Sequence, residues 1–314
     1  MLNDMYRVVR VSLPAVESET SSVKFNVEDR VAEFDRRADL GLYDRLYGPH
    51  GEVMDDTWQE LGDHHNLGDK DRGWKEQILN LRNPEALENE EGALNLECDW
   101  VTSYDVRALR GPDTPFFQLA AIGAVVTKDD QILLGTRGGA ITPERVKKFG
   151  SGLYGLPPGG SVSFRPEYIG DPNVDPIQDT IGAEFAEEIG PQFRFEYNGL
   201  IGIFEAFEPG PTGIKFLSLM RTTATLHEIQ EVNKEANAVY DELVSTVGKE
   251  DAKKELIIRK LPPDAWEHSE IFGIPLSLAS AGDRSLSRAL SYSSNKYTGI
   301  GAGALCTLEK FLQI

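Results

Sequence analysis

Three glutamates in the segment 183–190 have the residue type and the spacing of a metal-binding group. Glu184, Glu187 and Glu188 are separated by steps of three and four residues, and on a helix that turns about 100° per residue they share one sector. Like charges at these spacings cost about 0.2–0.5 kcal/mol per pair, so a compensating partner is expected. Clustered carboxylates are the hard oxygen ligands that Mg²⁺ or Mn²⁺ prefers, with positions left open for substrate phosphates. We therefore expect a divalent metal site; a solvated acidic face is the alternative interpretation.

Two neighbouring features would position these glutamates. Ile181, Phe185 and Ile189 fall on the adjacent sector of the helix expected over 176–189, which can therefore bury one stripe beside the carboxylates. The segment Leu156–Gly160 reads Leu-Pro-Pro-Gly-Gly, a rigid turn whose two glycines leave the backbone open to close approach. We expect this turn to lie against the helix.

The flanking segments read as strands and helices of an α/β protein. The apolar run 116–126 and the segment 131–137 predict a hairpin of strands, the first of them buried. Breaker residues in 111–115 separate this hairpin from a more polar N-terminal region. The other expected elements are strands at 6–13, 94–109, 200–207, 214–222 and 266–276, a long charged helix around 229–247 and a closing helix at 298–312.

The glutamate segment and its flanks resemble the Nudix hydrolases, which typically cleave a nucleoside diphosphate linked to another moiety. Their signature ends in Arg-Glu-apolar-any-Glu-Glu-any-Gly-apolar, and 184–190 matches this half from its Glu to its Gly, while Leu156–Gly160 is similar to the turn that precedes it, with one extra proline. The hairpin 123–137 and the Glu-containing segment 266–271 are similar to the strands around the signature. The resemblance covers about half of the chain.

The resemblance implies a set of ligands and catalytic groups. Glu184, Glu187 and Glu188 would hold Mg²⁺ (or Mn²⁺) as catalytic and metal-binding residues, together with the carbonyl of Gly160. The ion would bridge a diphosphate and lower the pKa of bound water. Family members often use one more glutamate outside the signature as base or ligand, and we expect Glu267 in this role, with Glu270 second.

Substrate contacts are expected at the turn and at the end of the hairpin. Gly159 and Gly160 would approach the ligand with their backbone, and Arg137, at the end of its strand, would meet a substrate phosphate. A surface arginine at a hairpin end is the alternative for Arg137. We interpret His268 as a packed or solvated side chain, which is the commoner situation for a lone histidine.

The chain departs from the family pattern in the first half of the signature. Ala183 stands where the family has its arginine, and Asp175 stands where it has its first glutamate. Asp175 followed by Pro176 is a plausible N-cap and first helical residue. In an alternative alignment Glu167 is the signature glutamate, with Arg165 available as a substitute cation.

The resemblance also implies the architecture and the partners. We expect an α/β fold, a Nudix-type α/β/α sandwich around a mixed sheet, in residues 113–314. Residues 1–112 would form an accessory region that shapes the pocket or a homodimer contact. With 32 Lys+Arg against 51 Asp+Glu, the net charge of −19 disfavours nucleic acid and membrane surfaces as partners. Two cysteines and a charged N-terminus suggest a cytoplasmic protein. The resemblance implies that its partner is a small-molecule nucleotide substrate.

Two other functions stay open at this point. The altered residues Asp175 and Ala183 favour a Nudix-fold sensor or regulator that binds a nucleotide without hydrolysing it. The three helix glutamates argue against this, because without a metal they would only repel one another. A structural protein with a solvated acidic face would show no dependence of its thermal stability on divalent ions.

Overall fold

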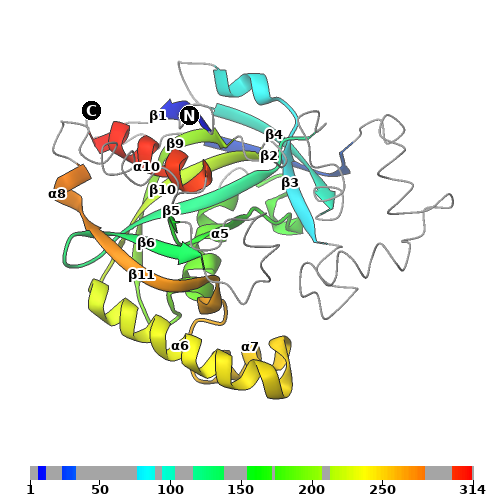
Figure 1. Ribbon diagram of the computed structural model, residues 1–314. Helices are drawn as coiled ribbons and strands as arrows, with labels where there is room; N and C mark the ends of the chain where they lie inside the picture. Colours follow the sequence, from blue (N-terminus) through cyan, green and yellow to red (C-terminus); the bar gives the residue numbers. More distant parts are fainter. Residues whose placement is uncertain are drawn as a thin grey trace.

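The computed structural model describes residues 6–11, 23–32, 76–88, 94–102, 116–137, 154–171, 174–206, 213–279 and 299–312. Its larger sheet runs through six strands in the order β1-β9-β10-β5-β6-β11 (Figure 1). Strands β10 and β5 are parallel, whereas the other neighbours along this path are antiparallel. The bounds are β1 Tyr6–Val11, β5 Leu119–Val126, β6 Gln131–Arg137, β9 Phe195–Ala206, β10 Gly213–Thr222 and β11 His268–Pro275. The prediction of an α/β fold around a mixed sheet is confirmed.

Strand β5 lies inside this sheet because its side chains are apolar on both faces. Every residue from Leu119 to Val126 is buried. Leu119, Ala121 and Val125 enter one core cluster, and Ile122, Ala124 and Val126 enter the other, as the two-residue period of a strand requires. The predicted hairpin of β5 and β6 is confirmed, and two short strands add to it: β7 Tyr154–Gly155 pairs with β6, and β8 Gly159–Ser161 pairs with β5.

Helices cover both faces of the larger sheet (Figure 1). On one face, α5 (Pro176–Glu184) and α6 (Leu226–Val247) place Ile181 and Ile229 in the first core cluster. On the other face, α10 (Gly299–Leu312) places Leu305 and Leu308 in the second. No helix in the described ranges is both long enough and apolar enough to cross a membrane. The remaining helical segments are η2 Pro84–Glu88, η3 Pro166–Tyr168, the π-helical η4 Phe185–Ile189, α7 Lys249–Ile258, η5 Ala265–Glu267 and α8 Leu276–Ala279.

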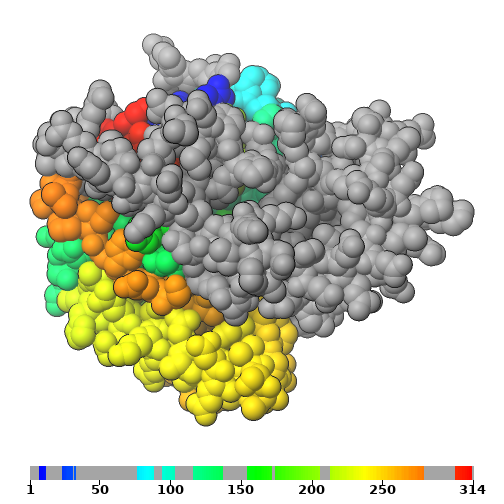
Figure 2. Space-filling view, viewed as in Figure 1, coloured from blue at the N-terminus to red at the C-terminus, as the bar shows by residue number. Residues whose placement is uncertain are grey.

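The predicted long charged helix is confirmed as α6. A capping box at Thr225 and Glu228 fixes its start. Its buried face carries Ile229 and Ala236, but also the polar Asn233. Figure 2 shows α6 and α7 in yellow along one end of the molecular surface, beside the orange β11 and α8.

Two predicted boundaries are wrong by a few residues. The strand expected from residue 266 begins at His268, because Ala265–Glu267 forms the 3-10 turn η5. The strand expected from residue 200 begins at Phe195 as β9. The 3-10 turn places Glu267 just before the strand rather than within it.

The described N-terminal residues are joined to the rest of the fold. Strand β1 is an edge of the larger sheet, while β2 (Val23–Val31), β3 (Gln77–Leu81) and β4 (Leu94–Thr102) form a second sheet in the order β2-β4-β3. The ring of Phe25 lies 5.8 Å from that of Phe216, and both belong to one core cluster. The breaker residues 111–115, residues 12–13 and residues 103–109 lie outside the described part, so the boundary at residue 112 stays a prediction.

A buried amide connects the two sheets. The Asn80 Nδ2 donates to Asp99 Oδ1 at 2.6 Å, and the Asn80 Oδ1 accepts from the Phe117 N–H at 2.7 Å. Asn80 and Asp99 are both buried, and burial raises the pKa of Asp99 while the Asn80 hydrogen bond opposes this rise. The amide therefore satisfies a buried carboxyl on one side and a backbone donor on the other.

Replacing this amide should cost more stability than replacing an exposed one. Asn80→Ala removes a hydrogen bond from the buried carboxyl of Asp99 and one from the part-buried N–H of Phe117, and it should lower the free energy of unfolding by about 2 kcal/mol or more. Asn83 also makes two hydrogen bonds, to Asn95 and Glu97, but both of these bonds are exposed. Asn83→Ala should therefore cost about 1 kcal/mol or less. Chemical denaturation measures both, and equal losses would contradict the role given to Asn80.

Candidate functional site

The helix that carries the glutamates starts at a well-formed cap. Asp175 Oδ1 accepts from the backbone N–H groups of Ile177 at 2.9 Å and Gln178 at 3.2 Å. The predicted N-cap at Asp175 and the first helical position at Pro176 are confirmed. Glu167 is exposed on the 3-10 turn η3. Asp175 therefore serves the start of the helix, while the glutamates lie at its other end.

The helix changes its winding at the glutamates. Gly190 N–H donates to the carbonyl of Phe185, five residues earlier, at 3.0 Å, so the last turn is π-helical rather than α-helical. The apolar stripe of Ile181, Phe185 and Ile189 is buried as predicted. The three glutamates differ in exposure: Glu188 is buried, Glu184 is half-buried and Glu187 is exposed.

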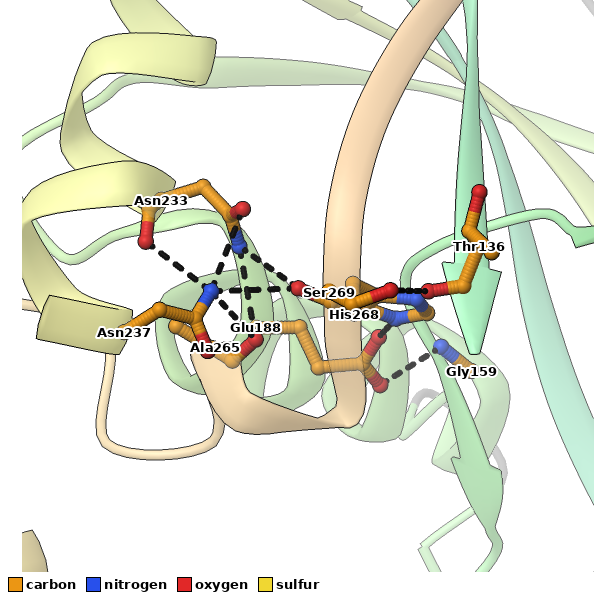
Figure 3. A network of polar contacts seen from close by, with 8 residues as sticks. All are labelled: Thr136, Gly159, Glu188, Asn233, Asn237, Ala265, His268 and Ser269. Carbon is orange, nitrogen blue, oxygen red and sulfur yellow. Dashed lines mark hydrogen bonds and ion pairs between the residues drawn. The ribbon is translucent and has the colours of Figure 1, made fainter. Parts of the chain in front are cut away.

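Glu188 is the most enclosed of the three carboxylates. Its side chain is 3 % exposed. Its Oε1 accepts from Gly159 N–H at 3.1 Å, and its Oε2 lies 2.7 Å from His268 Nε2 (Figure 3). A buried carboxylate without such partners would be strongly unfavourable. Strands β8 and β11 therefore hold this carboxylate from two directions.

His268 is a site residue that sequence reasoning missed. The side chain is packed, which is one of the two situations expected for it, but the buried imidazole also pairs with Glu188. The ring also lies against Gly135 of β6, where a Cβ atom would overlap it. The close approach of the ring requires glycine at this position. The two partners are far apart in sequence, so no local pattern could have revealed them.

Glu184 lies against the glycine turn. A Cβ atom at Gly160 would overlap the Glu184 carboxylate, so the glycine makes room for it. The pKa of Glu184 is raised to about 9, mainly by burial and then by the neighbouring carboxyls of Glu188, Glu187 and Glu267, in that order of effect. A hydrogen bond between the Glu184 and Glu188 carboxyls acts in the same direction. These two carboxyls therefore lie together, and the raised pKa of Glu184 favours its protonated form.

Glu187 occupies the outer side of the turn. Its side chain is exposed, and its carbonyl accepts from the Asp264 N–H at 2.8 Å. Loss of hydration and the charge of Asp264 raise the pKa of Glu187, while Lys253 opposes the rise. Lys253 is paired with Asp264. Glu187 thus lies near the other two glutamates, but its side chain is exposed beside the charged pair of Lys253 on α7 and Asp264 before η5.

The two candidates for the additional glutamate differ in their placement. Glu267 is half-buried, and its charge contributes to the raised pKa of both Glu184 and Glu187. Glu270 is exposed on β11, in register with Thr136. The arrangement favours Glu267. Arg137 ends β6 with its backbone in register with His268, but its side chain lies outside the described residues.

The carboxylates of Glu184 and Glu188 are of the ligand type that a divalent ion prefers, but they do not form a complete coordination shell. Among the residues that the structure describes, no three His, Cys, Asp or Glu side chains form a group ready to hold a metal ion. Mg²⁺, however, usually binds through one or two carboxylates and completes its shell with water and substrate phosphates. Glu184 and Glu188 provide such a pair. A dication would supply the positive charge that stabilises both of these neighbouring carboxyls in their ionised form.

The raised pKa of Glu184 predicts a specific pH dependence of stability without metal. This carboxyl has its ordinary pKa of 4.5 in the unfolded chain and a pKa of about 9 in the folded protein. The folded state therefore binds its proton more tightly, and the free energy of unfolding falls as the pH rises between these two values. In the presence of a chelator, Glu184→Gln should therefore melt above the wild-type protein at about pH 8, and the difference should vanish below about pH 4.5.

The exposed Glu270 provides the control for this measurement. Glu270→Gln should leave the melting temperature unchanged at either pH. A Glu184→Gln variant that melts below the wild-type protein at the higher pH would show that Glu184 is not held in a repulsive group.

No protein-family model matches this chain, and a search of curated proteins likewise found no match. Any proposal of a function therefore rests on the site itself. Two carboxyls at one end of a helix meet beside a glycine turn, with a buried histidine contributed by β11.

Proposed function

We propose that the chain is a Mg²⁺-dependent hydrolase of the Nudix type, which cleaves a phosphoanhydride bond in a nucleoside diphosphate linked to another moiety. The observation that carries this proposal is the meeting of the Glu184 and Glu188 carboxyls beside Gly159 and Gly160. The mixed sheet with helices on both faces is compatible with the α/β/α sandwich of that family.

The roles of the chain's own groups follow from their placement. Glu184 and Glu188 would hold the ion, and the carbonyl of Gly160, a residue that leaves room for the Glu184 carboxylate, is a further proposed ligand. When bound, the ion supplies charge neutralisation on the diphosphate oxygens and a more acidic water. Glu267, half-buried and close enough to act on the pKa of Glu184, is the proposed acceptor of the proton that the attacking water loses.

Other predicted residues receive more limited roles. The exposed position of Glu187 beside Lys253 and Asp264 suits a ligand recruited when substrate enters, rather than one already in place. Arg137 ends its strand as the backbone partner of His268, and this position next to the site suits the proposed contact with a substrate phosphate. Because the chain carries a net charge of −19, an anionic nucleotide would need the ion and such cations to bind.

A nucleotide sensor of the same fold is the second candidate. Ala183 supplies no charged partner to the glutamates, Asp175 is used as a helix cap, and the described side chains form no complete three-residue metal group. These observations are compatible with binding without turnover. Phosphate or nucleotide release from nucleoside diphosphate sugars, dinucleotides, ADP-ribose and nucleoside triphosphates, with Mg²⁺ present, separates an enzyme from a sensor.

Within that panel, two substitutions test the site directly. Glu184→Gln and Glu188→Gln each remove a charge that would bind the ion and should lower Mg²⁺-dependent turnover about 100-fold or more. Glu167→Gln changes an exposed glutamate on η3 and should leave turnover unchanged. Full activity in both site variants would overturn the assignment. Nucleotide binding by calorimetry with no product from any substrate would support the sensor.

A further inference from the structure

We propose that His268 is a positioning residue of this site: its imidazole fixes the orientation in which the Glu188 carboxylate meets Glu184. The inference rests on the proposed function in that Glu188 is taken as a ligand of the ion. It adds a residue outside the glutamate segment, contributed by β11, to the apparatus that prepares the site.

The first step is the geometry around Glu188. Its Oε1 accepts from Gly159 N–H of β8, and its Oε2 lies 2.7 Å from His268 Nε2 of β11, which is the donor when the imidazole carries its proton on Nε2. The side chains of Glu188 and His268 are 3 % and 7 % exposed, so water does not compete for these contacts. A carboxylate has about four lone-pair sites. These two contacts therefore fix the plane of the Glu188 carboxylate, and its further lone pairs can face Glu184.

The second step is that His268 is itself held in place. Its carbonyl accepts from Asn237 Nδ2 at 3.1 Å and from Asn233 Nδ2 at 3.4 Å, both on α6 (Figure 3). The same two amides donate to the carbonyl of Ala265 in η5, each at 3.3 Å. Asn233 is buried. The polar Asn233 on the inner face of α6 is thereby explained: it fixes the backbone from which the histidine projects.

The third step is the fit of the ring against β6. A side chain at Gly135 would overlap the imidazole, whereas a Cβ atom at Gly155, its partner across the β6–β7 pair, would meet nothing within 4 Å. Ala183, directly before Glu184, has no polar side chain to offer the glutamates. The side-chain partner of Glu188 therefore comes from β11, and the lack of a side chain at Gly135 leaves room for its ring.

Substitution at His268 separates a positioning role from a merely structural one. Ligand-orienting partners of metal sites are typically worth 10–100-fold in metal affinity. His268→Leu removes the donor and should weaken Mn²⁺ binding about 10-fold or more, measured by calorimetry and by the Mn²⁺-dependent rise in melting temperature. His268→Gln can place an amide N–H near the position of Nε2 and should restore most of the affinity.

A matched glycine pair tests the same claim without altering the histidine. Gly135→Ala should displace the ring and weaken Mn²⁺ binding, whereas Gly155→Ala should leave it unchanged. Circular dichroism establishes that each variant is folded. If Gly135→Ala does not fold, the two His268 variants decide the outcome.

The outcomes distinguish this inference from the proposed function. A wild-type protein that binds no Mn²⁺ contradicts the proposed function, and the inference falls with it. A wild-type protein that binds Mn²⁺, together with a His268→Leu variant that binds it equally well, overturns the inference alone. A crystal structure of His268→Leu adds a readout independent of metal: the Glu188 carboxylate should have rotated away from Gly159, and an unchanged orientation would also overturn the inference.

Discussion

The burial of one carboxylate, that of Glu188, is the constraint on which the rest of the site depends. A carboxylate removed from water must find hydrogen-bond donors or a cation, because its desolvation is otherwise prohibitively costly. Here the donors come from Gly159 on β8 and His268 on β11, two strands whose positions are set by the larger sheet. The sheet, the glycine turn and the helix end must therefore all be in place before this one group is satisfied.

The same arrangement forces carboxyls together at some cost to stability. The pKa of Glu184 rises to about 9 because the group is buried beside other acids. The helix tolerates this because other features hold it: Asp175 caps its start, and Ile181 and Phe185 are packed in the core. The core and the cap thus offset the unfavourable grouping of acids at the helix end, and a bound cation would relieve it.

Much of the scaffold was predictable from local pattern. The apolar run of β5 and the three- and four-residue steps of α6 specify a buried strand and a surface helix, and Asp-Pro at 175–176 specifies a helix start. The π-helical turn was not predictable, because spacing alone does not distinguish it from an α-helical one. The role of His268 was not predictable either, since its partner Glu188 is brought to it only by the tertiary fold.

The most direct test of the central claim is a crystal structure of the protein grown with Mn²⁺ and recorded at a wavelength that reveals the metal by anomalous scattering. The account predicts a single strong anomalous peak within bonding distance of carboxylate oxygens of both Glu184 and Glu188, with His268 still hydrogen-bonded to Glu188. Carboxyls of Glu184 and Glu188 that point apart, with no peak beside them at saturating Mn²⁺, would contradict it.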